Sequence, residues 1–426
     1  KKQKSGNAKA TLSKKELSAL QGQLAALVTP GKESFYTSDP RFLELVSQNP
    51  DIAVWSDGGL GKLAKMKKNP FAGLNINLFA KDNYKASAIN FENGRIISRN
   101  MNWLNDSVIS SMKAIYSRPY NAGLLNKIPE GQPLFFFTFS MNPEEMGAYF
   151  EKTGLTKIYQ EMLEKDSIRL SDFKGALQGD FMIAVNMAEK KNETAEEKPN
   201  PLSGLQVYLA ATVKDQQKMD KLLATVKEKT AEAKRKKEEV LRDNRDIADS
   251  TEMAVAVPDL ERDSTAITEA ISPSEEAEDS TGQAYPVKKS PFGDLKPVIS
   301  NENGLFLLSL SQDALDAYKE NNSNRFFKPI NDQYGKEPML MMTDLKTILS
   351  AVISFAPKKN NASEEEMQQV MDVIGTFGKM TVYGGKVEDH TITTTTEFSF
   401  SNPDENSLKQ LIKLLDLVSG FAAQKK

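Results

Sequence analysis

The stretch Asn90-Phe91-Glu92-Asn93-Gly94-Arg95-Ile96 decides the fold, because it carries a strong short-range signal for a β-hairpin. Asn-Gly at the two central positions favours a tight turn in which both residues adopt positive φ. The flanking residues predict strands at 85–91 and 95–98. The same Glu-Asn-Gly triplet recurs at 302–304, between predicted strands at 297–300 and 305–310. The chain is therefore expected to contain two hairpins built on one turn sequence.

Further features repeat at a similar separation. The two triplets are 210 residues apart, and later matches have gradually shorter offsets. These later matches are Asp106 with Asp313, the strand at 133–135 with 338–340, Phe173 with Phe377, Met219 with Leu408, and Leu222 with Leu411. The largest change in offset coincides with a loop at 189–201 that only the first copy has. We interpret this drift as an internal duplication with small insertions.

The predicted fold class is α+β, with two related modules of twisted antiparallel sheet and helices packed on one face. The strand at 391–400 supports this class, because it alternates on one face and carries a run of threonines outward. The predicted divisions are a helical N-terminal region with a short strand at 1–68, a first module at 69–228, a charged helical extension and acidic linker at 229–290, and a second module at 291–426.

The N-terminal region contains three predicted elements. Residues 11–28 have helical periodicity and a capping-box spacing, and a second short helix covers 41–48. A strand at 52–55 follows, and a turn at 57–59 ends it.

Two strands run directly into an Asn-Pro pair, at Asn142-Pro143 and at Asn402-Pro403. Asn suits the N-cap position and Pro suits the first helical position, so we predict a helix beginning at each pair. After the second pair, apolar residues recur with helical spacing and predict one buried helix face. They are Leu408, Leu411, Ile412, Leu415 and Val418.

Composition excludes several classes of function. Lys plus Arg (55) and Asp plus Glu (58) nearly cancel, so the chain has no overall basic charge for a nucleic acid. The absence of cysteine rules out disulfides and thiolate chemistry. No run of 18 apolar residues predicts a membrane-spanning helix, and the first residues do not resemble a signal peptide. The chain does not begin with Met, which leaves export open.

The segment between the predicted modules changes character. Residues 229–246 are rich in Lys, Arg and Glu and predict a helix, whereas residues 249–283 are acidic, rich in Ser and Thr, and poor in large apolar residues. We interpret the second part as a linker or an exposed insertion.

Two stretches of the sequence partly match motifs with known chemistry. His390 is the single histidine, and it precedes a Thr-rich strand without a nearby serine motif, so we expect a strand-end histidine instead of a catalytic triad or a metal site. The stretch 58–63 superficially resembles a phosphate-binding loop. Ser56 occupies the place of its first glycine and Leu63 the place of the Mg²⁺-binding hydroxyl, so a turn and a helix start explain it better.

The two Glu-Asn-Gly copies place Glu92 and Glu302 at equivalent positions. Glycan hydrolysis needs two carboxylates at a defined separation, so this pair is one catalytic hypothesis. Turn chemistry explains the same residues, and we favour that interpretation. Gly179-Asp180 is likewise expected to be a turn that leads into a buried strand at 181–185.

Aromatic residues suggest two further surfaces. The run Phe135-Phe136-Phe137 with Phe139 could stack on a ligand, but a central strand covered on both faces is the favoured interpretation. Trp55 and Trp103 could mark a glycan-binding surface, although they are not part of an aromatic cluster in the sequence.

Four short stretches in fixed order resemble a family of uncharacterised, Bacteroides-type cell-envelope lipoproteins, a domain-of-unknown-function family. They are residues 51–55, 90–96, 141–144 and 174–181. The resemblance implies an exported protein with a lipoprotein signal peptide, a lipid-bearing cysteine and a further N-terminal segment. None of these is present in this chain, and the resemblance supplies no catalytic residues.

The function predicted from the sequence is a non-enzymatic cell-envelope (lipo)protein that binds a ligand or a partner. The alternatives are a carboxylate-dependent glycan hydrolase and an assembly component that docks through the acidic linker. No catalytic, cofactor-binding or metal-binding residues are predicted, and no cofactor. The expected partner is an envelope protein or a glycan and not a nucleic acid, and membrane contact would come only through a lipid anchor that this chain lacks.

Overall fold

The structure is a computed structural model of the 426-residue chain. It describes residues 38–56, 82–156, 169–187, 204–248, 297–321, 323–355 and 364–424, with the single positions 18 and 160. Apart from position 18, the predicted helix at 11–28 lies outside these residues. The same is true of the turn at 57–59, the stretch 58–63, the loop at 189–201 and the acidic segment 249–283.

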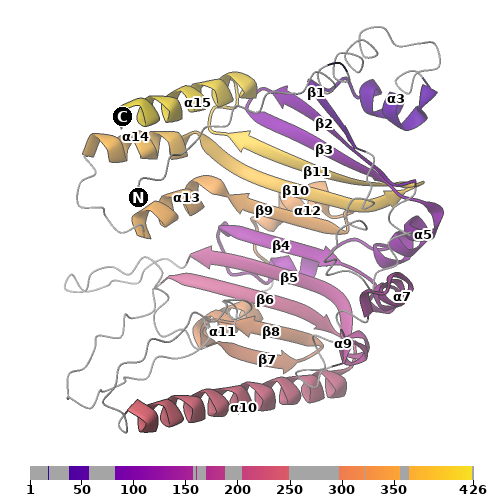
Figure 1. Cartoon of the computed structure of the whole chain (residues 1–426), viewed down its shortest axis with the longest axis vertical. Helices are drawn as coiled ribbons and strands as arrows, with labels where there is room; N and C mark the ends of the chain where they lie inside the picture. Colours follow the sequence, from indigo (N-terminus) through magenta and orange to yellow (C-terminus); the bar gives the residue numbers. More distant parts are fainter. Residues whose placement is uncertain are drawn as a thin grey trace.

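Eleven strands in the described part of the chain form one antiparallel sheet (Figure 1). From edge to edge the order is β1-β2-β3-β11-β10-β9-β4-β5-β6-β8-β7. The strands are β1 (Ile52–Ser56), β2 (Tyr84–Glu92), β3 (Arg95–Trp103), β4 (Phe135–Ser140), β5 (Leu177–Met187), β6 (Leu205–Val213), β7 (Val298–Glu302), β8 (Leu305–Ser309), β9 (Met339–Asp344), β10 (Phe377–Glu388) and β11 (Thr391–Phe400). The mixed α and β composition and the antiparallel pairing are confirmed.

Eleven helices in the described residues flank this sheet. They are α3 (Pro40–Ser47), α5 (Asp106–Ile115), α6 (Ala122–Asn126), α7 (Pro143–Thr153), α9 (Leu170–Ala176), α10 (Gln216–Ala248), α11 (Gln312–Glu320), α12 (Phe327–Tyr334), α13 (Leu345–Phe355), α14 (Glu364–Gly375) and α15 (Ser407–Gln424). The predicted helix at 41–48 corresponds to α3. The charge-dense helix predicted at 229–246 is the second half of α10, the long helix at the bottom of Figure 1.

The two Glu-Asn-Gly turns join β2 to β3 and β7 to β8, as predicted. In the second turn, Asn303 and Gly304 both have positive φ, at 54° and 74°. In the first turn only Gly94 does, at 68°. The expectation of two positive φ angles is wrong there, because Asn93 forms an antiparallel bridge with Asn406 instead.

The strands of the two predicted modules are interleaved in the sheet. The hairpin β2–β3 pairs with β11, from the far end of the chain, and the hairpin β7–β8 pairs with β6. Strands β4 and β9 pair with each other between these two groups. The result is one continuous sheet, so two separate modules remain a prediction.

The largest core covers one face of the sheet. Strand residues such as Phe136, Tyr208 and Leu307 are at most 1% exposed there, beneath α6, α11 and α12. Tyr208 stacks on Tyr318 of α11 with ring centroids 5.5 Å apart, and burial raises the pKa of both phenols. The two helices α11 and α12 come from the second half of the chain, so this core also joins both halves.

A smaller core lies on the opposite face. Phe306 directly precedes Leu307 in β8 and therefore points away from the largest core. It packs with Phe173 of α9 and with Met219 and Leu222 of α10. The prediction that helices cover one face is wrong, because β8 is apolar on both faces and each face is covered.

The two Asn-Pro pairs have different roles. Asn142 caps α7 as predicted, since its side chain accepts from the Glu144 amide at 3.1 Å. Asn402 instead accepts from the Asp404 amide at 3.2 Å in a turn, and α15 begins five residues later. The prediction of a helix at Asn402-Pro403 is wrong, because the segment 402–405 packs against the β2–β3 turn, where the Gly94 amide donates to the Glu405 carbonyl at 2.8 Å.

The buried face of α15 differs from the prediction at three of the five predicted positions. Of the other two, Leu411 is half-buried, and the side chain of Val418 lies outside the described residues. The residues that point into the protein are Ser407 (0% exposed), Gln410 (6%) and Leu414 (8%). The apolar residues that lie in solvent are Leu408 (42% exposed), Ile412 (51%) and Leu415 (56%). The helix is anchored by polar contacts at its start, where the Gln410 side-chain amide donates to the carbonyls of Asn402 and Glu405 at 2.8 Å each. These contacts fix its rotation and leave one apolar stripe outward.

Gly179 and Asp180 lie inside β5 and not in a turn before it. The pairing of β5 with β6 shifts register between Leu177 and Phe181, which defines a β-bulge. Gly179 has φ of +102°, and a Cβ at this position would collide with the Met141 carbonyl oxygen. The predicted turn is therefore wrong, because the positive φ of Gly179 forms a bulge inside β5 and the strand continues through it.

Asp180 is the centre of a buried polar cluster at this bulge. Its side chain is 6% exposed, and one oxygen accepts from the Ser140 hydroxyl at 2.7 Å and lies 3.0 Å from the Arg118 guanidinium. The other oxygen accepts from the Thr212 hydroxyl at 2.9 Å. Buried carboxylates need such partners, so this cluster ties β4, β5 and β6 together.

Candidate functional site

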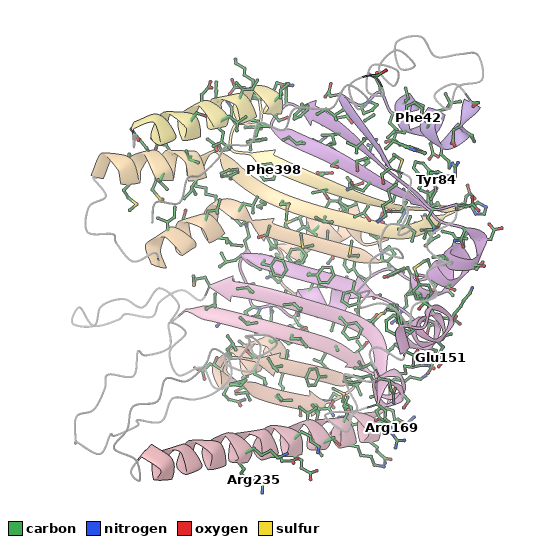
Figure 2. All side chains as sticks on the ribbon, in the orientation of Figure 1. Phe42, Tyr84, Glu151, Arg169, Arg235 and Phe398 are labelled. Carbon is green, nitrogen blue, oxygen red and sulfur yellow. The ribbon has the colours of Figure 1, made fainter. Side chains whose placement is uncertain are left out.

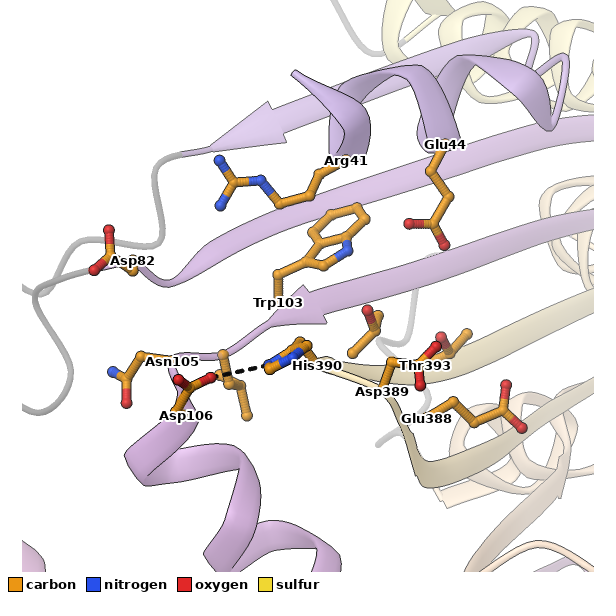
Figure 3. A pocket seen from close by; sticks show the side chains of 12 residues that line it. Arg41, Glu44, Asp82, Trp103, Asn105, Asp106, Glu388, Asp389, His390 and Thr393 are labelled. Atoms are coloured by element: carbon orange, nitrogen blue, oxygen red, sulfur yellow. Dashed lines mark ion pairs between the residues drawn. The ribbon is translucent and has the colours of Figure 1, made fainter. Parts of the chain in front are cut away.

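A cavity of about 600 Å³ lies where the ends of β3 and β11 meet α3 and α5 (Figure 3). Its lining carries more carboxylates than cations, and we call it the acidic pocket. The carboxylates are Glu44, Asp82, Asp106, Glu388 and Asp389. The two cationic or titratable basic groups in the lining are Arg41 and His390.

One wall of the acidic pocket is the turn between β10 and β11. This turn consists of Asp389 and His390, because Glu388 pairs with Thr391 across it. The His390 carbonyl accepts from the Leu104 amide at 2.9 Å, which attaches the turn to the chain leaving β3. The His390 Nδ1 lies 3.2 Å from the Asp106 carboxylate, as the dashed line in Figure 3 shows.

The opposite side of the pocket is the start of α5. The Asn105 side chain accepts from the Val108 amide at 3.1 Å and caps the helix. The Asn105 amide in turn donates to the side-chain oxygen of Asn83 at 3.0 Å, and Asn83 is only 8% exposed. These bonds fix Asp106 in the first helical turn, with its side chain 90% exposed at the mouth of the pocket.

Helix α3 borders the pocket on a third side, through Arg41 and Glu44. Asp39 caps this helix by accepting from the Arg41 amide at 2.9 Å, and its other oxygen lies 2.6 Å from the Arg41 guanidinium. The guanidinium carbon also lies 3.6 Å from the ring centroid of Tyr84. The bond to Arg41 lowers the pKa of Asp39 and raises the pKa of Arg41. Arg41 is thereby held and neutralised by a residue outside the pocket.

Two pocket carboxylates lie on strained backbone. Asp82 and Asp389 have φ of +56° and +46°, in the left-handed region that non-glycine residues adopt at a cost. Strained positions persist where the surroundings hold them, and they gather at sites that bind or react. The two positive φ angles therefore support the acidic pocket as the candidate site.

Trp103 lines the pocket and belongs to an aromatic cluster that packs against α3. Trp103 is 5% exposed, and its ring centroid lies 5.5 Å from that of Trp55. Trp55 also contacts Tyr84 at 5.7 Å and Phe42 at 5.8 Å; Figure 2 labels the latter two side chains. The structure thus brings both tryptophans together. They are packed in a core, so they do not present the open ring face that stacking on a sugar needs.

The carboxylates of the two Glu-Asn-Gly turns are not brought together. Glu92 is in β2 and Glu302 is in β7, and eight strands lie between these two in the sheet. Glu92 pairs with Arg95 at 2.7 Å, and Glu302 pairs with Lys319. Glu92 therefore forms an ion pair within its own hairpin, and Glu302 forms one with α11. The hypothesis that the two glutamates act together as a catalytic pair has no geometric support.

His390 directly precedes β11, as expected of a strand-end histidine, and it forms the two-residue turn with Asp389; its side chain is 62% exposed. Together with Asp106 it supplies two members of a possible triad. The hydrogen bonds of the described residues include none at its Nε2, where a nucleophilic hydroxyl would have to bind. The described residues therefore show an ion pair here, and none of their hydroxyl groups is hydrogen-bonded to the imidazole.

The phenylalanine run is divided between the two faces of the sheet. Phe136 is buried in the largest core, whereas Phe135, Phe137 and Phe139 lie half-buried on the other face. Phe137 and Phe139 stack at 5.2 Å, and Phe139 stacks on Phe181 at 4.9 Å. The expectation that β4 is covered on both faces is correct for the face that carries Phe136. It is only partly correct for the face that carries Phe135, Phe137 and Phe139, which are half-buried.

The carboxylates of the acidic pocket were not identified from the sequence. They come from four segments, around positions 44, 82, 106 and 388, that are far apart in the chain. No spacing motif links them. The signal in the sequence was local: Glu388 and Asp389 directly precede the single histidine, just before the predicted strand at 391–400.

Among the described residues, no three His, Asp or Glu side chains are placed to hold a metal ion. No helix in the described ranges is long and apolar enough to cross a membrane. Comparison with protein families, with curated proteins and with solved structures finds no match to this chain.

Proposed function

We propose that this protein is a non-enzymatic binding protein whose acidic pocket takes a positively charged group of a ligand or partner. The observation that carries the proposal is the charge of the pocket. Five carboxylates line it, and one of them, Glu388, pairs at 2.8 Å with Lys386 outside the lining. The basic groups in the lining are Arg41, which Asp39 already neutralises, and His390. Four carboxylates without a lysine or arginine partner within the described residues therefore remain. A concave surface lined by one sign of charge attracts ligands of the opposite sign.

Solvation of the carboxylates favours binding over catalysis. The side chains of Asp106 and Glu388 are 90% and 72% exposed, so both are surrounded by water. General acid–base catalysis uses carboxyl groups enclosed in an environment that separates their proton affinities. Exposed carboxylates instead give a site of moderate affinity that depends on ionic strength.

We propose a cell-envelope location for this binding role. The support is the resemblance of residues 51–55, 90–96, 141–144 and 174–181 to envelope lipoproteins. Under this proposal, the cationic group would belong to an envelope protein, with Lys or Arg side chains entering the pocket. Fractionation of cells that produce the protein tests the location, and recovery only in the cytosolic fraction would contradict it.

We further propose that the fold arose by internal duplication. In sequence order, strands β2, β3, β4, β5 and β6 correspond to β7, β8, β9, β10 and β11. If each strand is replaced by its counterpart, and β1 at the edge is left out, the sheet has the same strand order when it is read from the opposite edge. Equivalent backbone contacts support this relationship. The Phe400 amide donates to the Gly94 carbonyl at 2.8 Å, and the Val213 amide donates to the Gly304 carbonyl at 2.8 Å.

Side-chain contacts repeat in the same way. The Asn406 side-chain amide donates to the Phe91 carbonyl at 2.8 Å, and the Gln216 side-chain amide donates to the Asn301 carbonyl at 2.7 Å. Because each half lends a hairpin to the other, we expect that neither half folds alone and that co-expressed halves fold together. A half that unfolds cooperatively by itself would contradict this arrangement.

The proposed binding role can be tested by tryptophan fluorescence. Trp55 and Trp103 are the two tryptophans of the chain, and Trp103 lines the pocket. We expect trilysine to change the emission in a saturable way and trialanine to leave it unchanged. Raising the salt concentration should weaken the binding. No response to trilysine at low salt would contradict the proposal.

Variants locate the binding. Glu388→Gln and Asp106→Asn should each weaken trilysine binding, because each removes one pocket charge. Glu151→Gln is the matched control, since it removes an exposed carboxylate on α7, away from the pocket (Figure 2). A neutral N-acetylglucosamine oligomer is titrated in parallel. Binding of that glycan, unaffected by either pocket variant, would overturn the cationic proposal in favour of a glycan ligand.

A further inference from the structure

We propose that α15 is a dimerisation surface that pairs with α15 of a second copy of this chain in antiparallel orientation. The starting observation is the outward apolar stripe of this helix. Leu408, Ile412 and Leu415 are 42%, 51% and 56% exposed, while the buried positions of the same helix include Ser407 and Gln410. A helix that buries polar residues and exposes large apolar ones has an unfilled contact.

The corresponding helix of the first half behaves differently. In α10, Met219 and Leu222 are 5% and 6% exposed and pack in the core with α9. Its exposed large apolar residue in the described part is Val226, at 38%. The exposed stripe is therefore a property of α15 and does not follow from the shared architecture.

Spacing within the stripe indicates what covers it. Leu408, Ile412 and Leu415 are separated by four and three residues, which is the alternation found along the seam of two packed helices. A neighbouring helix of the same kind can insert its side chains between them. The α15 helix of a second copy of the chain has the same spacing, and it is present in every solution of this protein.

Charge complementarity selects the second copy and the antiparallel orientation. Lys409 and Asp416 each follow a stripe residue by one position, so they lie on the same flank of the stripe. An antiparallel pair centred near Ile412 places Lys409 of one copy beside Asp416 of the other, and this contact occurs twice. In a parallel two-fold pair the equivalent flanks lie on opposite sides of the interface, so this contact between Lys409 and Asp416 would not form. Within the described part of its own chain, Asp416 forms no salt bridge, whereas Lys409 lies 3.1 Å from Glu405.

The surface is also accessible. In Figure 1, α15 lies at the outer end of the molecule, beside α14. Helix α14 adds Met367 and Met371, each 38% exposed. The acidic pocket, by contrast, is lined from α3, α5, β3 and the β10–β11 turn, and it shares no residue with the stripe.

Sedimentation velocity of the 426-residue chain over a wide range of concentration tests the proposal. We expect a reversible monomer–dimer equilibrium. Ile412→Lys should raise the dimer dissociation constant by more than about a hundredfold, because it buries an unpaired charge in the interface. Val226→Lys is the matched control: it places the same charge at an exposed apolar position of α10 and should leave the equilibrium unchanged. Circular dichroism checks that both variants are folded.

Charge exchange tests the orientation. Lys409→Asp and Asp416→Lys should each weaken the dimer by about tenfold, and the double exchange should restore it. A wild-type chain that stays monomeric at every concentration would overturn the proposal, as would a dimer that Ile412→Lys leaves intact. Vesicles of zwitterionic lipid form a second arm. If monomeric protein binds them and Ile412→Lys abolishes this, the stripe is a lipid-binding surface and the proposed dimer is wrong.

Discussion

A Cβ atom at Gly94 would lie 2.5 Å from the Cα of Pro403, closer than real Cβ contacts allow. The β2–β3 turn of the first half is therefore in direct backbone contact with the loop that leads to α15 near the end of the chain. The equivalent glycine in the second half is less crowded, since the nearest atom to a Cβ at Gly304 is the Val213 carbonyl oxygen at 3.7 Å.

This difference predicts unequal effects of the same substitution. Both glycines have positive φ, so Gly304→Ala should cost about 1 kcal/mol of unfolding free energy from backbone strain alone. Gly94→Ala adds the collision with Pro403 and should cost about 3 kcal/mol or more. Urea unfolding of the two variants measures this. Equal destabilisation would show that the 402–405 loop does not hold the first turn.

The Asp180 cluster predicts a large effect in the middle of the sheet. Asp180→Ala removes the partner of a buried Ser140 hydroxyl and of Arg118, which is one-third exposed, so we expect a loss of about 3 kcal/mol. Asp332→Ala, at an exposed position of α12, is the control and should change stability by less than about 0.5 kcal/mol. Thermal or urea unfolding distinguishes the two. A result for Asp180→Ala within the range of the control would contradict the described network.

Asp39 predicts a defined pH dependence. Its pKa is lowered from 3.8, chiefly by the bond to Arg41, so the folded state favours the ionised form. The stabilisation is fully present above pH 3.8 and is lost as the pH falls through the lowered pKa. Asp39→Asn keeps the helix cap and removes the charge, so at neutral pH it should cost about 1 kcal/mol. This gap should close well below pH 3.8; a gap independent of pH would be inconsistent with the ion pair.

Two buried hydroxyl groups predict stabilising substitutions. Ser309 and Ser407 are 0% exposed, and their side-chain oxygens have no hydrogen-bond partner among the described residues. An unsatisfied buried hydroxyl costs free energy, so Ser309→Ala and Ser407→Ala should each be neutral or stabilise the fold by up to about 1 kcal/mol. Differential scanning calorimetry can measure the change. Clear destabilisation by either alanine would contradict this prediction, because it would mean that the serine hydroxyl makes a stabilising hydrogen bond.

Local signals in the sequence predicted the strands and turns well. The Asn-Gly pairs located both hairpins, because turn geometry depends on a few neighbouring residues. The same locality explains the errors. Nothing near Asn402 shows that Gly94 lies against Pro403, and this contact turns an apparent helix start into a loop. The interleaving of strands from the two halves is also invisible, since it depends on pairing over more than 200 residues.

The candidate site was harder to predict than the fold. His390 and Trp103 were singled out separately, but their common location depends on the sheet placing β11 beside β3. The carboxylates at positions 44, 82 and 106 carry no spacing signature and resemble ordinary solvated residues. These carboxylates come together around one cavity only in the folded chain. The sequence alone therefore does not show that they form one negatively charged site.

The most direct test of the binding role uses His390, because a chain with a single histidine gives one imidazole signal in an NMR spectrum. This imidazole lines the acidic pocket, with its Nδ1 3.2 Å from the Asp106 carboxylate. We expect that adding trilysine at low salt shifts the His390 resonance in a saturable way, and that Glu388→Gln reduces the shift at equal ligand concentration. An imidazole signal that stays unchanged while trilysine binds elsewhere, or does not bind, would contradict the assignment of this pocket as a cation-binding site.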